Sequence, residues 1–387
     1  MLLRTKRYML PLALLAVVLI PAVVAGRPAP EPPALSAPMI EWARYYYDSG
    51  KYDKAKKLLT KHTPATGDEA YLLAEVYDRQ EKRDSAIAMF ARAFELGNAA
   101  GAYHVALAEQ YHHPDADAQK AMDWYRRGAE AGNTACQHAL GFIYAEGETI
   151  GDTHIEYNDS LSLKYYLMAA EGGDAEAQTI VGDCFLYGTG TAVDTGEAFR
   201  WYDRAAARQH PRALYMTGEF YYAGTPQIPA DQAKAKERYE RALASPDIKG
   251  SVTESAANER LGAIYMTDPY TDYRKALRYL NAAVDADSQA PENMSRAKAN
   301  LAVIYSTGAT GIRQDPRKAF ELLVSACEEL IKDETALYNL GKCYEIGFGT
   351  ETDPALALKY YRMAAERGYP NAVDAVKRLE TPPADTP

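Results

Sequence analysis

Small and apolar residues recur along most of the chain with the spacing of an α-helix. An alanine is followed five residues later by a glycine and three residues after that by an aromatic residue, as in Ala177, Gly182 and Phe185. Residues at these offsets share one helix face, and the small ones let a neighbouring helix approach closely. The pattern therefore predicts a helix, here called helix A, in every copy. Further copies contain Ala213, Gly218 and Tyr221; Ala257, Gly262 and Tyr265; Ala297, Ala302 and Tyr305; and Ala336, Gly341 and Tyr344.

A second pattern follows each helix A and begins with Asp or Asn. A side-chain oxygen at this position can accept hydrogen bonds from the free amides of a first helical turn, so these residues are predicted N-caps. A small residue, an aromatic pair and two alanines follow, as in Ala198, Trp201-Tyr202 and Ala205-Ala206, and the pattern often ends at a glycine that can close the helix. This predicts a second helix, helix B. The predicted caps are Asp117, Asn158, Asp194, Asp231, Asp272, Asp315 and Asp353, and the closing glycines are Gly97, Gly132, Gly173 and Gly368.

The two helices form a unit that recurs at intervals of 33 to 44 residues. One helix pair cannot bury its apolar face alone, whereas stacked pairs share a continuous core. We therefore predict an all-α fold, an α-solenoid of antiparallel helix pairs stacked as a right-handed superhelix. Nine pairs are expected between Ala37 and Tyr369, followed by a C-terminal cap helix at residues 370–380 and a disordered tail at residues 381–387.

The order of these motifs resembles a known repeat family. LG or VG on helix A, a glycine-rich loop, Asp, and then KA/EA-x-x-WY-x-x-AA-x-x-G resembles the Sel1-like repeat over about residues 100–370. GKYDKAKKLL at residues 50–59 looks like the second helix of a tetratricopeptide repeat, whose period is 34 residues. Tetratricopeptide-like pairs are therefore expected at residues 37–98 and a Sel1-like solenoid at residues 99–380. The resemblance implies a scaffold, because members of the family act as adaptors and assembly factors.

The N-terminus has the features of an export signal. Three Lys and Arg residues precede an uncharged stretch, residues 8–26, in which small residues occupy the positions that a signal peptidase requires. We therefore expect residues 1–26 to be a signal peptide and residues 27–36 a Pro-rich spacer, with the protein periplasmic or secreted. The stretch of 19 residues also reaches the lower limit for spanning a bilayer, so an uncleaved anchor in the inner membrane is the alternative. Membrane contact is expected only in that case.

Charge and cysteine content narrow the class further. The formal net charge is -10, and Lys and Arg are not clustered, which argues against nucleic acid as the main partner. Four cysteines are too few for a disulfide framework in an exported chain of this size, so most are expected to be small buried residues. Cys327 on a helix B and Cys343 on the next helix A should be neighbours, either as two buried thiols or as a disulfide.

Patterns that would indicate catalysis or metal binding are weak. His104, His112 and His113 lack further ligands at helical spacing, and the glycines of residues 188–194 lack the Lys-Ser/Thr of a phosphate-binding loop. No G-x-S-x-G sequence is present. We therefore expect no catalytic residue, no cofactor, no metal and no enzyme. The alternative is a secreted repeat protein that binds a cell-wall ligand or hydrolyses a β-lactam-type substrate, as is claimed for relatives.

The residues that vary between repeats indicate a binding surface. In tetratricopeptide-type stacking, helix A lines the concave side, and its exposed positions lie three before, one after and four after the Gly or Ala slot. Four of the first five residues directly after the slot are acidic, and the row becomes more apolar towards Ala263 and Val303. We predict a groove that binds a protein or peptide with a basic segment, whereas the plainer alternative is an ordinary polar surface. The predicted groove residues are Tyr71, Glu75, Asp78, Glu109, His138, Phe142, Asp183, Leu186, Tyr215, Glu219 and Tyr222.

Overall fold

The computed structural model describes residues 30–112, 116–286, 290–309, 311–328 and 333–380. The predicted signal segment and the predicted tail lie outside these residues. The chain divides into two compact units, one within residues 1–136 and 150–153 and the other within residues 137–149 and 154–387. Each unit consists of helix pairs and is described by itself.

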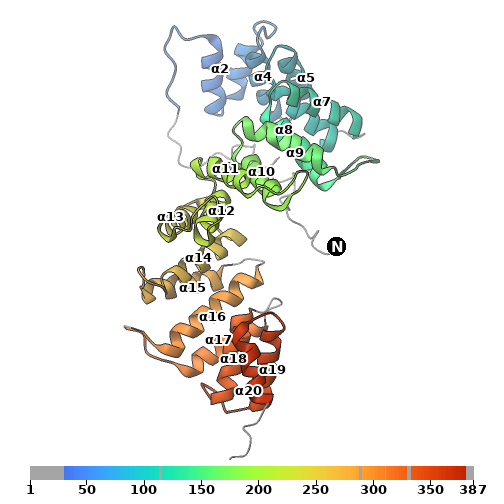
Figure 1. The fold of residues 1–387 in the computed structure, drawn as a ribbon. Helices are drawn as coiled ribbons and strands as arrows, with labels where there is room; N and C mark the ends of the chain where they lie inside the picture. The colour runs from blue at the N-terminus through green and yellow to red at the C-terminus, as the bar shows by residue number, and fades with distance from the viewer. Residues whose placement is uncertain (1–29, 113–115, 287–289, 310, 329–332, 381–387) are drawn as a thin grey trace, which may run out of the picture. The chain divides into compact units, whose positions relative to one another are not determined.

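The described part of the first unit contains three antiparallel helix pairs (Figure 1). In each pair a helix A packs against the helix B that follows it, and the third helix A ends in one π-helical turn. The elements are α2 (Met39–Asp48), α3 (Tyr52–Leu59), α4 (Gly67–Arg79), α5 (Arg83–Glu95), α6 (Ala100–Leu107), η1 (Ala108–His112) and α7 (Ala118–Glu130).

Six further pairs and a final helix follow from α8 onward. The last helix packs against α19 and takes the predicted place of a cap. The elements are α8 (Thr134–Glu146), β1 (Glu148–Ile150), β2 (Thr153–Ile155), α9 (Asp159–Glu171), α10 (Ala175–Tyr187), α11 (Thr195–Ala207), α12 (Pro211–Ala223), α13 (Gln232–Leu243), η2 (Pro246–Ile248), α14 (Val252–Ile264), α15 (Tyr273–Asp285), α16 (Pro291–Thr307), α17 (Pro316–Glu328), α18 (Glu334–Ile346), α19 (Pro354–Ala365) and α20 (Pro370–Glu380). Over the described residues the predicted all-α fold is confirmed, with three helix pairs in the first unit and, from α8 onward, six pairs and a cap helix; a small hairpin, β1–β2, is the addition that the repeat pattern does not predict.

The starts of the second helices follow from their capping residues. Asp194 Oδ1 accepts a hydrogen bond from the amide of Glu197 at 3.0 Å, and Asn158 Oδ1 accepts one from the amide of Leu161 at 3.0 Å. All seven predicted caps make this bond, which satisfies one of the free donors of the first turn. The predicted closing glycines have the positive φ that only glycine adopts without steric cost; they are Gly97, Gly132, Gly173 and Gly368.

The glycine of helix A recurs because it lies against a tyrosine ring of helix B. A Cβ on Gly182 would come within 2.6 Å of the Tyr202 ring, and a Cβ on Gly218 would come equally close to Tyr239. Both tyrosines are fully buried, so the missing glycine side chain is the space that the ring fills. Equivalent contacts join Gly141 to Tyr166 and Gly341 to Tyr361.

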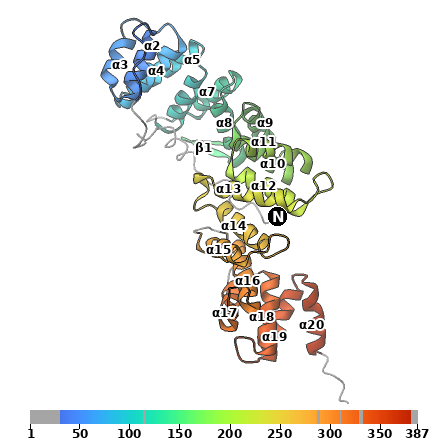
Figure 2. The same cartoon turned by 90° about the vertical axis from the view of Figure 1, so that its left-hand side faces the viewer.

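In the second unit, the first helices of successive pairs contact one another directly. α12 lies beside α14, α14 beside α16, and α16 beside α18, and Figure 2 shows these four helices in succession. Their solvent-facing side chains therefore form a continuous surface, called the helix-A face below. Of the groove residues that the sequence predicts, Tyr215, Glu219 and Tyr222 lie on α12, whereas the others of this unit lie on the preceding first helices α8 and α10.

Among the helices of the described ranges, none has the length and apolar character needed to cross a membrane. Residues 8–26, for which an anchor was the alternative expectation, are not among them.

Candidate functional site

Asp183 on α10 is the most deeply buried of the predicted groove residues. Its Oδ1 accepts a hydrogen bond from the Tyr202 hydroxyl at 2.6 Å, and its Oδ2 lies 2.8 Å from Nη2 of Arg212. Burial raises the pKa of this carboxyl group above its ordinary value, although Arg212 acts in the opposite direction. The expectation that Asp183 is solvent-exposed is wrong, because the side chain is 1% exposed.

Glu219 on α12 occupies the same repeat position and is also paired within the protein. Arg260 of α14 holds it with two hydrogen bonds, from Nε at 2.8 Å and from Nη2 at 3.0 Å. The Tyr239 hydroxyl donates to the same carboxylate at 2.5 Å. The Arg260 guanidinium also lies over the ring of Tyr222, 5.1 Å from its centroid. A planar guanidinium is well suited to such a two-pronged contact, so this carboxylate has few free lone pairs.

A buried carboxylate on α14, Glu259, extends the pairing to the next helix. Arg260 Nη1 lies 3.5 Å from it, and Arg296 Nε of α16 lies 3.6 Å from it. Asn300 of α16 donates a hydrogen bond to its other oxygen at 3.3 Å. Burial raises the pKa of Glu259 above its ordinary value. Positive and negative groups thus alternate across α10, α12, α14 and α16, and we call this set the paired-charge stretch; it consists of Asp183, Arg212, Glu219, Arg260, Glu259 and Arg296.

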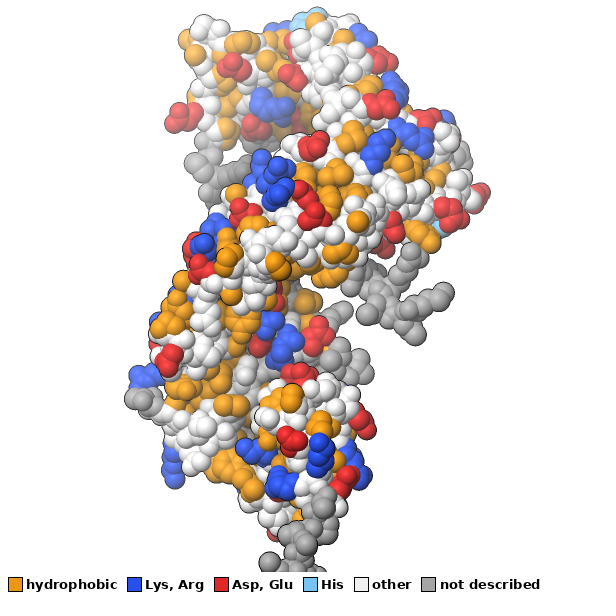
Figure 3. Space-filling model, in the orientation of Figure 1, with side chains coloured by type: hydrophobic (Ala, Val, Ile, Leu, Met, Phe, Trp, Pro, Cys, Tyr) orange, Lys and Arg blue, Asp and Glu red, His pale blue; other side chains and the backbone are white. Residues whose placement is uncertain are grey.

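The arginines of this stretch were not predicted from the sequence. Arg212 stands one residue before an alanine of the helix-A pattern, whereas Arg260 stands two residues before the glycine slot. Because they occupy different repeat positions, the repeat spacing does not reveal them. On the face that Figure 3 displays, positive and negative side chains are interspersed and do not gather into a patch of one sign.

In the first unit, Tyr71 of α4 belongs to a small buried cluster. Its hydroxyl lies 2.9 Å from Nε2 of His104, whose ring stacks on Phe90 with centroids 4.2 Å apart. Burial lowers the pKa of His104 to about 4 and raises the pKa of Tyr71 to about 12. The imidazole is therefore neutral at physiological pH, and this predicted groove residue has a packing role.

The acidic groups of the first unit differ in exposure. Glu75 of α4 accepts a hydrogen bond from Arg44 Nη1 of α2 at 2.7 Å, so it too has an arginine partner. Asp78 is exposed at the end of the same helix. Glu109 is half-buried, and it lies in the π-helical turn at the end of the third helix A. Of the carboxylates in the predicted acidic row, Glu75, Asp183 and Glu219 are thus neutralised inside the protein, which weakens the argument for a basic partner.

The remaining predicted residues lie on α8, α10 and α12 of the second unit. His138 Nδ1 is 2.9 Å from Asp174 Oδ2, in a half-buried contact with the residue that caps α10. The ring of Tyr215 lies 5.7 Å from that of Tyr239, Leu186 packs beside Tyr202 and Phe220, and Phe142 is half-buried on α8. None of these side chains is fully exposed.

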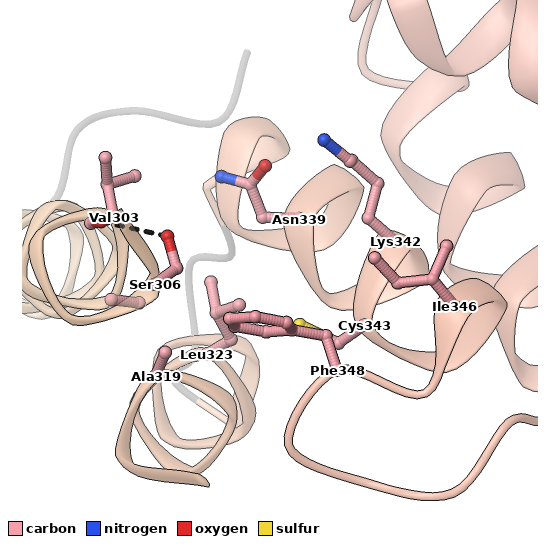
Figure 4. Close-up of a pocket in the computed structure, with 10 residues that line it drawn as sticks. Val303, Ser306, Ala319, Leu323, Asn339, Lys342, Cys343, Ile346 and Phe348 are labelled. Carbon is pink, nitrogen blue, oxygen red and sulfur yellow. Dashed lines mark hydrogen bonds between the residues drawn. The ribbon is translucent and has the colours of Figure 1, made fainter. Parts of the chain in front are cut away.

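A pocket of about 200 Å³ opens on the helix-A face between α16 and α18. Its floor consists of buried apolar side chains, among them Leu323 of α17, which is 3% exposed. At its rim Ile346 is 64% exposed, and Lys342 and Asn339 project from α18 (Figure 4). The row of residues after the Gly or Ala slot was predicted to become more apolar towards Val303, and Val303 lines this cavity. The lining consists of Ala302, Val303, Ser306, Ala319, Leu323, Asn339, Lys342, Cys343, Ile346 and Phe348.

The pocket lies at a repeat position that has a smaller residue than tyrosine. Leu323 stands four residues after Ala319, at the position that is Tyr202 or Tyr239 in the pairs of the paired-charge stretch. Leucine has neither the ring that fills the helix A contact nor the hydroxyl that reaches an acidic residue. The residue after the slot in α16 is Val303, so this repeat position supplies an apolar side chain to the lining where other pairs supply a carboxylate. The leucine is visible in the sequence but does not by itself indicate a pocket, because Leu280 at the same position of α15 packs against Gly262.

The described residues offer no arrangement that indicates metal chemistry. Within them, no three His, Cys, Asp or Glu side chains come together in a way that could hold a metal ion. The four cysteines are buried free thiols, and Cys327 and Cys343 belong to one apolar cluster as neighbours without a disulfide. Burial raises the pKa of Cys343 to about 11, so the thiol is protonated at neutral pH and is a poor nucleophile.

Stacked helix pairs with a variable row of side chains on helix A define an α-solenoid scaffold. Within this class, the sequence pattern of the Sel1 repeat matches residues 101–133, 134–174, 175–210, 211–246, 255–288, 295–329 and 335–369. The chain belongs to the Sel1 repeat family, which confirms the resemblance seen in its motifs.

Some of the similar proteins have regulatory names. Chitin synthase regulatory factor 2 of Schizosaccharomyces pombe is 24% identical over 262 residues, which are 66% of this chain and 42% of that protein. Activator of C kinase protein 1 of Saccharomyces cerevisiae is 26% identical over 281 residues, which are 67% of this chain and 44% of that protein. The chain thus matches less than half the length of these relatives.

Among solved structures, the fold is similar to that of c5321, a protective antigen present in uropathogenic Escherichia coli strains. The TM-score is 0.60 with 18% sequence identity, covering 88% of this chain and 75% of the other. At this identity the similarity concerns the fold alone.

Proposed function

We propose that this chain is an exported scaffold that binds a protein or peptide partner through its helix-A face, in an adaptor, assembly or regulatory role. The observation that carries the proposal is the continuous row of first helices from α12 to α18, in which the side chains that do not repeat face solvent together. A row of helices presents an extended surface to a partner segment. The regulatory names of two relatives support the same class of function.

Export is the second part of the proposal. It is supported by the three basic residues that precede the uncharged stretch at residues 8–26. Intact-mass measurement of the protein from the exported fraction tests it. Cleavage near residue 26 gives a periplasmic or secreted protein, an uncleaved chain in the membrane fraction gives an anchored one, and retention of the whole chain inside the cell contradicts export.

Site-specific photocrosslinking in the producing cells tests the binding surface. A photoreactive amino acid replaces Tyr222 or Lys342 on the helix-A face and, as matched controls, Arg200 or Arg317 on helices B. Arg200 and Arg317 are 70% and 85% exposed, so both controls are accessible. We expect one partner to form adducts with the helix-A positions alone. Adducts from the helix B positions alone, or from none of the four, would contradict the proposal.

A further inference from the structure

We propose that the pocket between α16 and α18 receives one leucine- or phenylalanine-sized side chain of a partner segment, and that an Asp or Glu of the same segment pairs with Lys342. The inference rests on the function proposed above. It goes further by naming the chemistry of the partner at one end of the helix-A face.

The volume of the pocket fits a single side chain. Small-molecule sites commonly enclose about 300–1,000 Å³, whereas a cavity of about 150 Å³ lined by apolar residues holds a benzene ring. The pocket here is about 200 Å³ and has a buried floor that includes Ala302, Leu323 and Cys343. An apolar side chain of a peptide would therefore fill it, while a cofactor-sized ligand would not.

The surface around the opening favours an apolar side chain. Ile346 is among the most exposed large apolar residues of the described chain, and Phe348 and Val303 are half-buried beside it. An occupant that covered Ile346 would remove apolar surface from water, which is the main source of affinity at such contacts. Figure 4 shows that Val303, Ile346 and Phe348 come from both sides of the opening.

The charge at the rim selects an acidic segment. Lys342 is exposed and, within the described ranges, makes no ion pair. The nearest acidic side chain on its own helix, Glu345, is already engaged, because it accepts hydrogen bonds from the Tyr361 hydroxyl at 2.6 Å and from Arg378. Asn339 at the same rim has no side-chain hydrogen bond among the described residues and can donate to a carboxylate. The partner residue beside the pocket is therefore expected to be negatively charged.

The test uses the full chain and a phage library of random twelve-residue peptides. Selection on the native protein is followed by counter-selection on Leu323→Phe, which fills the pocket with a ring that other pairs carry at this repeat position. Affinities of the selected peptides, made synthetically, are measured by fluorescence anisotropy on the native chain, Leu323→Phe and Lys342→Glu. Lys249→Glu is the control, because Lys249 is an exposed lysine in the loop after η2. Circular dichroism establishes that each variant is folded.

We expect the selected peptides to contain one Leu or Phe with Asp or Glu beside it. Lys342→Glu should weaken their binding by about tenfold, since attraction becomes repulsion, and Lys249→Glu should leave it within about twofold. If basic peptides are selected, if no peptide is selected, or if Lys342→Glu binds as tightly as the native chain, the inference is wrong. If Leu323→Phe does not fold, the affinity measured for the folded Lys342→Glu variant still tests the inference.

Failure of this inference can be told apart from failure of the proposed function. If a partner forms photocrosslinks with Tyr222 but not with Lys342, the helix-A face is the binding surface and the pocket is not its anchor. If neither position forms a crosslink, the proposed function itself is wrong.

Discussion

The first helices α10, α12 and α14 differ from α16 and α18 in how their side chains are paired, although all belong to the same kind of helix pair. In α10–α14, a tyrosine fills the glycine slot of two pairs, and Tyr202 and Tyr239 reach carboxylates that arginines neutralise. In α16–α18, Leu323 replaces the tyrosine and a pocket remains open beside Lys342, which has no ion-pair partner among the described residues. The same kind of helix pair thus supports both a surface whose charges are paired within the protein and a surface with an open pocket.

The difference also separates stability from binding. A buried carboxylate must keep its partners, because removing one leaves a charge without solvent. Exposed residues at the rim of the pocket, such as Lys342, do not depend on a charged partner, so they can be substituted with little effect on the fold. We therefore expect substitutions in the paired-charge stretch to affect unfolding, and substitutions around the pocket to affect binding.

Removing Arg260 should destabilise the protein more than removing Lys342 at the rim of the pocket. Arg260→Ala leaves Glu219 and Glu259 short of a cation, and we expect the free energy of unfolding to fall by about 3 kcal/mol. Arg317→Ala is the matched control, because that arginine pairs with Glu321 at an exposed site and should cost less than about 1 kcal/mol. Lys342→Ala should change stability by less than about 0.5 kcal/mol. Urea unfolding followed by circular dichroism measures all three, and equal losses for Arg260 and Lys342 would remove the distinction between the two regions.

Filling the same repeat position should have unequal effects in two pairs. Leu280 of α15 packs tightly on Gly262, since a Cβ on that glycine would come within 2.5 Å of the leucine. We expect Leu280→Phe to overpack this contact and cost about 2 kcal/mol, whereas Leu323→Phe enters an existing pocket and should cost less than about 1 kcal/mol. Thermal unfolding of the two variants measures the difference. Equal destabilisation would show that the space at Leu323 is not available to a ring.

The sequence predicts the fold well because packing repeats. Gly182, its tyrosine partner and the cap Asp194 recur at fixed spacing, and each has a local physical cause that the structure confirms. The surface was predicted less well because Asp183, assigned to solvent by its repeat position, is covered by Arg212 from the next pair. Such a contact depends on two residues at unrelated positions of successive repeats, so it cannot be predicted from the spacing within one repeat.

The pH dependence of two glutamates should run in opposite directions. Burial raises the pKa of Glu259 above its ordinary value of 4.5, so the folded protein binds its proton more tightly than the unfolded chain. Its contribution to stability is then fully present below 4.5 and is lost as the pH rises through the higher folded value. For Glu345 of α18, the hydrogen bond from Arg378 lowers the pKa, so its contribution is present above 4.5 and is lost as the pH falls through the lower folded value.

Urea unfolding of the native chain, Glu259→Gln and Glu345→Gln between about pH 3 and pH 7 measures this contrast, because glutamine removes the titrating proton at similar size. Relative to Glu259→Gln, the native chain should gain stability as the pH falls towards 4.5. Relative to Glu345→Gln, it should lose stability as the pH falls below 4.5. The effect is the smallest of the three because Arg260 and Arg296 oppose the shift at Glu259 and because Glu345 is only partly buried. If both stability differences changed with pH in the same direction, burial would not determine the pKa of Glu259. The paired-charge stretch would then be as open to water as the surface around Glu345.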